Sequence, residues 1–192
     1  MALRRRGFVS VGAVVACCAL VAGCTPTQPA SAPPPTPATT TPTESQIERQ
    51  MRLDYEAAEQ AYRANMAEQD RQSQLGTAEK TEALTSTARG DYLRFALQVL
   101  RDIRDSGWRA NGPTTIRGVA PGGWQENRIQ LKACEDNSAI KFTNKKGRDV
   151  TPKDVVRTYV QDLIVTRVDG RWKVSEVESR PVKTYEGVSC AA

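Results

Sequence analysis

Histidine is absent from all 192 residues of this sequence. Without an imidazole the chain cannot build a Ser-His-Asp triad, a Cys-His pair or a metal site with histidine ligands. The sequence also lacks a glycine-rich phosphate-binding loop and the paired-cysteine spacing of zinc sites. We therefore expect no metal, no cofactor and no catalysis that depends on these groups.

A strong excess of one charge is also missing once the N-terminus is set aside. The formal net charge is +5, but Arg4, Arg5 and Arg6 belong to a first segment, residues 1–23, that contains no acid. Without these three arginines the net charge falls from +5 to +2. A nearly balanced chain gives no reason to expect a nucleic-acid partner.

The N-terminus has the layout of a secretion signal. A basic start is followed by an uncharged, mostly apolar stretch over residues 7–22, and small residues precede Cys24. Because a comfortable membrane span needs ~20 apolar residues, a single anchor helix is the less favoured alternative. The sequence Val-Ala-Gly-Cys at residues 21–24 matches the cleavage box of bacterial lipoproteins. We therefore expect residues 1–23 to be a signal peptide.

Cleavage at this box would make Cys24 the first residue of the mature protein and its lipidation site, carrying a diacylglyceryl group and a palmitate. The predicted location is the outer face of the cytoplasmic membrane, with the lipid as anchor and the protein facing the cell wall. Residues 25–43 contain seven Pro and seven Thr, no charge and no large apolar side chain. Together with Cys24 they form a predicted disordered linker, residues 24–43. It is either a plain spacer or a stalk with glycosylated threonines.

Two cysteines, Cys134 and Cys190, remain after Cys24 and the two inside the signal peptide are assigned. Two cysteines in an exported domain most often pair. We expect a disulfide that ties the C-terminal tail to a strand. The alternative is one free reactive thiol and one bystander.

Residues 44–192 are expected to form one domain. Residues 44–75 contain neither Pro nor Gly, and their apolar side chains recur at three- and four-residue steps. This stripe consists of Ile47, Met51, Tyr55, Ala58, Tyr62 and Met66. The spacing predicts an amphipathic helix that Thr43 or Ser45 caps and that ends at Gly76.

A second helical pattern covers residues 78–105, with a break near Gly90. The apolar stripe after the break consists of Leu93, Ala96, Leu97, Leu100 and Ile103. Asp91 is the expected cap of the second half, and Ser106-Gly107 the expected end.

After Gly107 the pattern changes from helical to alternating. The expected strands cover residues 114–119, 127–134, 140–142, 155–168 and 171–181. Residues 121–123, Pro-Gly-Gly, are expected to turn, and Asp169-Gly170 is a strong hairpin signal.

Helices followed by antiparallel strands predict an α+β domain, in which N-terminal helices pack on a curved antiparallel sheet. Two motifs add a resemblance: Cys134-Glu135-Asp136-Asn137-Ser138 and, over residues 168–174, Val-Asp-Gly-Arg-Trp-Lys-Val. With the element order, they resemble the lipid-anchored and secreted actinobacterial domains with a nuclear transport factor 2-like (cystatin-like) fold. The resemblance covers roughly residues 45–190. It implies a sheet wrapped around a conical cavity that the helices close, and it implies no reaction.

Asp162 is the candidate catalytic residue. On the predicted strand 155–168 it shares the more apolar face with Val160 and Ile164. A carboxyl group that lines a cavity has a raised pKa and can act as a base. The favoured alternative is a hydrogen-bonding role at a bulge or at the rim of the sheet. Asp136 and Ser138 are interpreted as turn formers.

Three functions of different class follow. The favoured one is a lipid-anchored extracytoplasmic binding or interaction module without catalysis, whose cavity holds a small apolar ligand or whose sheet meets an envelope protein. The second is a cavity enzyme that uses Asp162 as base. The third is a structural subunit of a cell-envelope complex, which an exposed apolar patch on the outer sheet face would favour.

Overall fold

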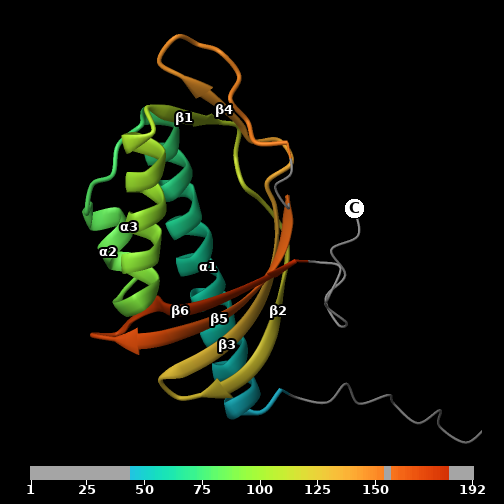
Figure 1. The fold of residues 1–192 in the computed structure, drawn as a ribbon. Helices are drawn as coiled ribbons and strands as arrows, with labels where there is room; N and C mark the ends of the chain where they lie inside the picture. The colour runs from blue at the N-terminus through green and yellow to red at the C-terminus, as the bar shows by residue number, and fades with distance from the viewer. Residues whose placement is uncertain (1–43, 154–156, 182–192) are drawn as a thin grey trace, which may run out of the picture. The chain divides into compact units, whose positions relative to one another are not determined.

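The computed structural model describes residues 44–153 and 157–181, which belong to one unit, Thr43–Ala192. Its elements are α1 (Gln46–Leu75), α2 (Glu82–Thr87), α3 (Gly90–Asp105), β1 (Trp108–Asn111), β2 (Thr115–Gln125), β3 (Arg128–Asp136), β4 (Lys141–Asn144), β5 (Thr158–Val168) and β6 (Arg171–Pro181). Helices come first and antiparallel strands follow, so the predicted α+β class is confirmed (Figure 1).

Helix α1 is the long helix that the apolar spacing predicts. The Ser45 hydroxyl accepts a hydrogen bond from the Glu48 backbone N–H, and the Glu48 carboxylate accepts one from the Ser45 N–H. This capping box satisfies donors that the first turn leaves unpaired. At the other end Gly76 adopts a φ of 68°, a left-handed conformation that glycine reaches without steric cost.

The second helical pattern is interrupted near Gly90, as predicted. Helix α2 ends at Thr87 and α3 begins at Gly90. Asp91 lies in the first turn of α3, where the helix dipole favours a carboxylate. It is not the cap: Arg89 holds the N-cap position, and no side-chain hydrogen bond caps this helix.

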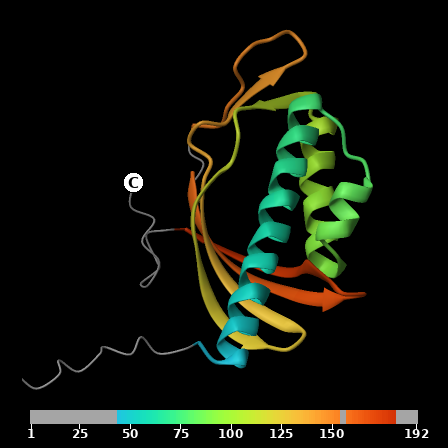
Figure 2. The same cartoon turned by 180° about the vertical axis from the view of Figure 1, so that it is seen from behind.

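Four strands form the main sheet in the order β2-β3-β5-β6, and each pairs antiparallel with its neighbour. The helices lie on one face of this sheet (Figures 1 and 2). The β5–β6 hairpin turns at Asp169 and Gly170 with positive φ values of 51° and 74°. That is the hairpin turn expected of this dipeptide.

The turn predicted at residues 121–123 is wrong. Strand β2 continues through them to Gln125, and the chain turns at residues 126–127. The register with β3 shifts between Pro121 and Trp124, which marks a bulge. Strand β2 is an edge of the sheet. Proline and glycine are tolerated at edges and bulges because fewer ladder hydrogen bonds depend on them there.

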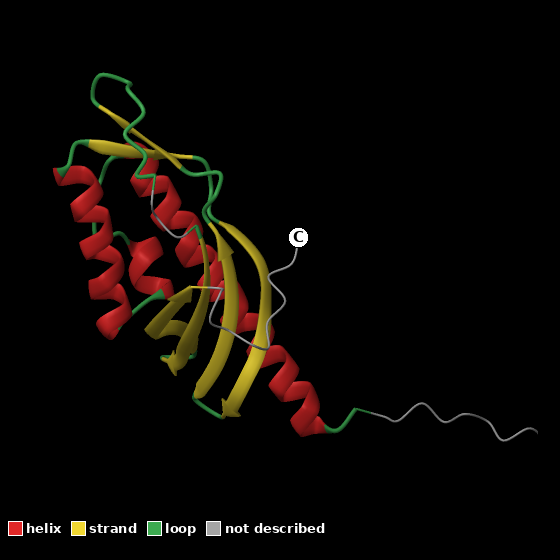
Figure 3. Ribbon diagram, turned by 45° about the vertical axis from the view of Figure 1, so that its right-hand side comes forward, coloured by secondary structure: helices red, strands yellow, loops and turns green. Residues whose placement is uncertain are grey.

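A separate two-stranded sheet pairs β1 with β4, and the sequence pattern did not predict β1. The Trp108 and Phe142 rings pack with centroids 5.8 Å apart, and the Asn111 side chain donates to Thr143 Oγ1 at 3.0 Å. Figure 3 shows this small sheet at one end of the helices and of the main sheet.

The core lies between the helices and the main sheet. Its buried members are Ala58, Tyr62, Ala88, Tyr92, Ile129, Leu131, Ala133, Leu163, Val165, Trp172 and Val174. The alternation of β3 and β5 therefore turns Ala133 and Leu163 toward the helices. It turns Cys134 and Asp162 to the opposite face of the sheet.

Several predictions fall outside the described residues. They are the signal peptide 1–23, the lipidated Cys24 with its linker 24–43, residues 155–156 of the predicted strand 155–168, and the tail that carries Cys190. Among the helices that are described, none is both long enough and apolar enough to cross a membrane.

Candidate functional site

A cavity of about 430 Å³ lies between the helices and the main sheet. Helices α1 and α3 form one wall, and β3, β5 and β6 form the other. Ala110 of β1 and Phe142 of β4 belong to the lining, so the small sheet contributes to one end. The lining thus combines residues of the helices, the main sheet and the small sheet.

The apolar side of this cavity is built largely by α3. Phe95, Val99 and Ile103 follow one another at four-residue steps on one face of that helix and line the cavity. Phe95 is 52% exposed and Val99 37% exposed, so these two side chains also border solvent. They form an apolar rim through which a ligand can enter.

Glu135 of β3 is the buried carboxyl group of the cavity and is 5% exposed. The Tyr62 hydroxyl donates to its Oε1, and Gln161 Nε2 donates to its Oε2 at 3.0 Å. Burial raises the pKa of Glu135, and the nearby Asp70 raises it further, whereas the two hydrogen bonds oppose the shift. Burial, with the charge of Glu135, also raises the pKa of Tyr62. Tyr62 therefore stays a donor.

Asp70 of α1 is the second carboxyl group of the lining. Its two oxygens accept from Thr114, one from the backbone N–H and one from the hydroxyl, both at 2.9 Å. Burial raises the pKa of Asp70, and these hydrogen bonds partly offset the effect. The two hydrogen bonds between Thr114 and Asp70 also hold α1 against the segment that leads into β2.

A chain of amide and hydroxyl groups joins the three helices beside the cavity. Gln69 Nε2 donates to Asn65 Oδ1 at 2.6 Å and to the Tyr92 hydroxyl at 3.2 Å. Asn65 Nδ2 donates to Thr87 Oγ1 at 2.9 Å. Since Gln69 and Tyr92 line the cavity, this chain holds that wall in place.

Asn137 contributes an unpaired acceptor. It follows β3, lines the cavity, and its backbone N–H donates to the Arg157 carbonyl at 2.8 Å. Its Oδ1 atom is buried and has no hydrogen-bond partner in the part of the chain that the structure describes. A buried acceptor of this kind is costly unless a ligand or water satisfies it.

Asp162, the candidate from the sequence, is not in this cavity. It lies on the face of the sheet away from the helices, in a separate groove with Lys132 and Glu178. These two residues are opposite Asp162 in the sheet, Lys132 on β3 and Glu178 on β6.

The more apolar face of β5, which carries Asp162, is therefore not the face that lines the cavity. The cavity is lined by the other face of β5, which carries Tyr159, Gln161 and Leu163. The physical reason is that β5 is a central strand buried in part on both faces. Val160, on the face of Asp162, and Leu163, on the other, are both at most 1% exposed. Apolar content alone cannot distinguish two such faces.

Cys134 is fully buried on the face away from the helices and is disulfide-bonded. Its partner lies outside the described residues, so the pairing with Cys190 stays a prediction. Asp136 forms the predicted turn contact, since its Oδ1 accepts from the Ser138 backbone N–H at 2.8 Å. Hydrogen bonds from Ser138, and then from Arg117, lower the pKa of Asp136 to about 2.

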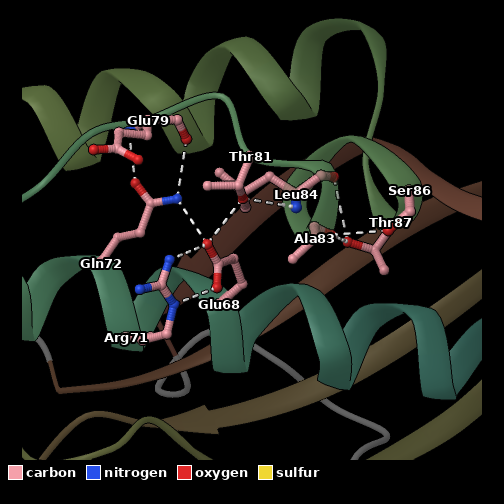
Figure 4. A network of polar contacts seen from close by, with 9 residues as sticks. All are labelled: Glu68, Arg71, Gln72, Glu79, Thr81, Ala83, Leu84, Ser86 and Thr87. Carbon is pink, nitrogen blue, oxygen red and sulfur yellow. Dashed lines mark hydrogen bonds and ion pairs between the residues drawn. The ribbon is translucent and has the colours of Figure 1, made fainter.

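A second buried glutamate, Glu68, is not part of the cavity lining. It lies in a network of hydrogen bonds and an ion pair (Figure 4). It accepts from Arg71 at 2.7 Å, and from Gln72 and Thr81 at 2.9 Å each. Gln72 also bonds both backbone groups of Glu79, at 2.6 and 3.0 Å. The network ties the loop between α1 and α2 to α1.

The sequence contained a signal for Glu135 that the prediction did not use. Ile129, Leu131 and Ala133 alternate along the strand and so lie on one face, and Glu135 is the next residue on that face. A carboxyl group that continues an apolar face is either at an end of the strand or buried. Asp70 has a comparable signal, because it follows Met66, the last residue of the predicted apolar stripe, by four positions and so continues that face of α1.

Comparison with known proteins gives weak structural similarities and no sequence match. No family model matches this sequence, and no curated protein sequence matches it. The intermembrane space region of the chloroplast protein ARC6 is similar in structure, with a TM-score of 0.41 and 15% identity over 62% of this chain and 93% of that one. Aln2 from a Streptomyces species gives a TM-score of 0.44 and 12% identity over 68% of this chain and 92% of that one. Neither likeness carries an argument about activity.

Proposed function

We propose that this protein is a lipid-anchored extracytoplasmic binding module whose cavity holds a small, mostly apolar ligand. The cavity of about 430 Å³ between α1, α3 and the sheet is the observation that carries the proposal. Cavities of this size, with apolar walls and a few convergent polar groups, are typical of small-molecule sites. The apolar rim at Phe95 and Val99 gives such a ligand a way in.

The proposed location rests on the N-terminal sequence. Cys24 carries the lipid, residues 25–43 span the distance to the folded domain, and the domain faces the cell wall. We assign the domain to the nuclear transport factor 2-like fold of actinobacterial envelope lipoproteins. This assignment is supported by the sequence motifs and by the order of helices and strands. An envelope protein partner at the sheet is compatible with the same anchor.

A binding experiment with a neutral apolar probe tests the proposed site. Naphthylethanol is expected to bind saturably to the full chain in lipid nanodiscs. The substitution Val99→Trp fills the rim and should abolish binding. Arg94→Trp places the same side chain at a position of α3 that is 73% exposed and outside the lining, so it should bind as the natural chain does. Equal binding by both variants would refute the cavity as the site.

The anchor has its own test. Cells that express the natural chain and take up labelled palmitate should transfer the label to the protein, which should fractionate with membranes. Cys24→Ser should lose the label. Cys18→Ser changes a cysteine inside the predicted signal peptide and should retain it. Label that persists in Cys24→Ser would refute the lipoprotein assignment.

Proton transfer is a second candidate function, and Glu135 replaces Asp162 as its base. The observation in its favour is a buried carboxyl group in the lining of a cavity. The test is the ring opening of nitrobenzisoxazole, a reaction that a desolvated carboxylate accelerates. Glu135→Gln should abolish any acceleration, and an inactive natural chain would remove this candidate.

The third candidate, a structural subunit, lacks the feature that would favour it. The large apolar side chains exposed in the described residues are Ile47, Leu53, Leu75, Phe95 and Val99. All of them lie on α1 or α3, and none lies on the outer face of the sheet. The described residues therefore offer no apolar patch there for a partner.

A further inference from the structure

Among the described residues, the lining of the cavity contains acidic side chains but no basic one. Its acids are Asp70 and Glu135, and no Lys or Arg is among the described residues that line it. None of the groups that shift the pKa of Glu135 is a cation. The two carboxyl groups therefore share a cavity whose described lining supplies no positive charge to either.

Three side chains of the lining, Glu135, Asp70 and Asn137, offer acceptor oxygens. Glu135 and Asp70 each accept with both carboxylate oxygens, and every carboxylate oxygen has a further lone pair. Asn137 Oδ1 is a third acceptor, buried and without a donor in the described part of the chain. A ligand that satisfies these groups has to bring N–H or O–H donors.

Aromatic rings line the same space. They belong to Tyr92, Phe95, Phe142 and Tyr159. The face of an aromatic ring attracts a cation that approaches within ~6 Å of its centroid. The rings that accommodate an apolar body thus also favour a positive charge on it.

We infer that the ligand of this cavity is an organic amine. Its protonated amino group donates to the acceptors of Glu135, Asp70 and Asn137, and its apolar body lies against Phe95 and Val99. The inference rests on the proposed binding function and names the class of its ligand. A protonated amine supplies both the missing charge and up to three donors, and hydrogen bonds between charged groups are stronger than neutral ones. An anionic ligand would instead add a negative charge beside two acids.

An inorganic cation fits less well than an organic one. The described residues contain no group of three or more His, Cys, Asp or Glu side chains placed to hold a metal ion. A bare ion would also leave the apolar side of the cavity, at Phe95, Val99 and Ile103, without a partner.

The experiment compares three ligands with one apolar body: naphthylethylamine, naphthylethanol and naphthylacetate. Each is titrated calorimetrically at neutral pH into the full chain in nanodiscs of zwitterionic lipid, with empty nanodiscs as blank. The amine is expected to bind about tenfold or more tightly than the alcohol, and the carboxylate more weakly than both. If the alcohol or the carboxylate binds as tightly as the amine, the inference fails while the binding function stands. If none of the three binds, the binding function fails with it.

Substitutions locate the amine. Glu135→Gln and Asp70→Asn remove an ionisable group with little change of volume, and each should erase most of the preference for the amine over the alcohol. The controls Glu82→Gln and Asp169→Asn remove exposed acids of α2 and of the β5–β6 turn and should keep the full preference. Near-UV circular dichroism establishes that each variant is folded. A full preference in either folded cavity variant overturns the assignment of that carboxyl group.

Discussion

Glu68 and Glu135 are both buried, yet their surroundings move their pKa values in opposite directions. Hydrogen bonds from Arg71, Gln72 and Thr81 lower the pKa of Glu68 to about 2. Glu135 has no cation beside it, so burial raises its pKa. The two pKa values differ because Glu68 has a cation and several hydrogen-bond donors beside it. Their effect exceeds that of desolvation at Glu68 but not at Glu135. Ionisation therefore stabilises the fold at one glutamate and opposes it at the other.

Glu68→Gln tests the first case. Because the folded pKa is depressed, the stabilisation is present above the unfolded value of 4.5 and disappears as the pH falls through about 2. The variant should lose about 2 kcal/mol of unfolding free energy at neutral pH, a figure reduced for the exposure of Arg71. The difference from the natural chain should shrink toward pH 2. Urea unfolding across this range measures it, with Glu82→Gln as a control that should follow the natural chain.

Glu135→Gln tests the second case. Because the folded pKa is raised, the natural chain loses stability as the pH rises from the ordinary value of 4.5 through the folded pKa. Glutamine carries no such cost. The stability of the variant relative to the natural chain should therefore increase between pH 4 and pH 8 in urea unfolding. Parallel pH profiles for the two proteins would show that Glu135 is not desolvated in the folded state.

At the scale of elements, the β1–β4 sheet contributes the lining residues Ala110 and Phe142 to one end of the cavity. Gly112 directly follows β1 and adopts a φ of 102°, a region that side chains rarely reach. A Cβ atom at this position would lie 2.6 Å from the Ala139 carbonyl oxygen, in the loop before β4. The close approach of these two backbones therefore requires glycine.

Gly112→Ala should destabilise the protein by about 2–4 kcal/mol, because it combines backbone strain with a clash against backbone. Gly170→Ala is the matched control. Its φ is also positive, at 74°, but a Cβ there meets nothing within 4 Å, so strain alone should cost about 1 kcal/mol. Thermal unfolding of the two variants compares these costs. Equal losses would mean that the loop moves away from Gly112 without cost.

At the scale of the whole molecule, the predicted bridge joins the C-terminal tail to the main sheet. Cys134 lies in β3, fully buried, and Cys190 is its expected partner because the other cysteines fall in the predicted signal peptide and at the predicted lipidation site. The closed loop has more than fifty residues. On the chain-entropy account such a loop stabilises the folded state by ~3–4 kcal/mol.

Peptide mapping without reductant should recover the Cys134 peptide joined to the Cys190 peptide. Cys190→Ser should lower the unfolding free energy by about 3 kcal/mol. Cys17→Ser, inside the predicted signal peptide, should leave it unchanged. Free thiols at both positions in exported protein would contradict the bridge.

The helices and the β5–β6 hairpin were predictable because their signals are local. Ser45 starts α1 through hydrogen bonds to the first turn, and Gly76 ends the helix through its left-handed backbone conformation. Both effects act within one turn of the chain. Asp169-Gly170 does the same for the hairpin. The prediction of a turn at residues 121–123 was wrong because proline and glycine occur at bulges of edge strands as well as in turns. Whether a strand is at an edge depends on pairing with distant residues.

The sequence by itself determined the α+β class, the long first helix and the positions of the cysteines, since composition and short-range periodicity encode these features. Only the tertiary structure decided that Glu135 and Asp70, which are 65 positions apart, share one cavity and that Asp162 does not. The physical reason is that β5 is apolar on both faces. The face of β5 that points inward is the one that the helices cover. Packing between segments far apart in the sequence determines which face that is.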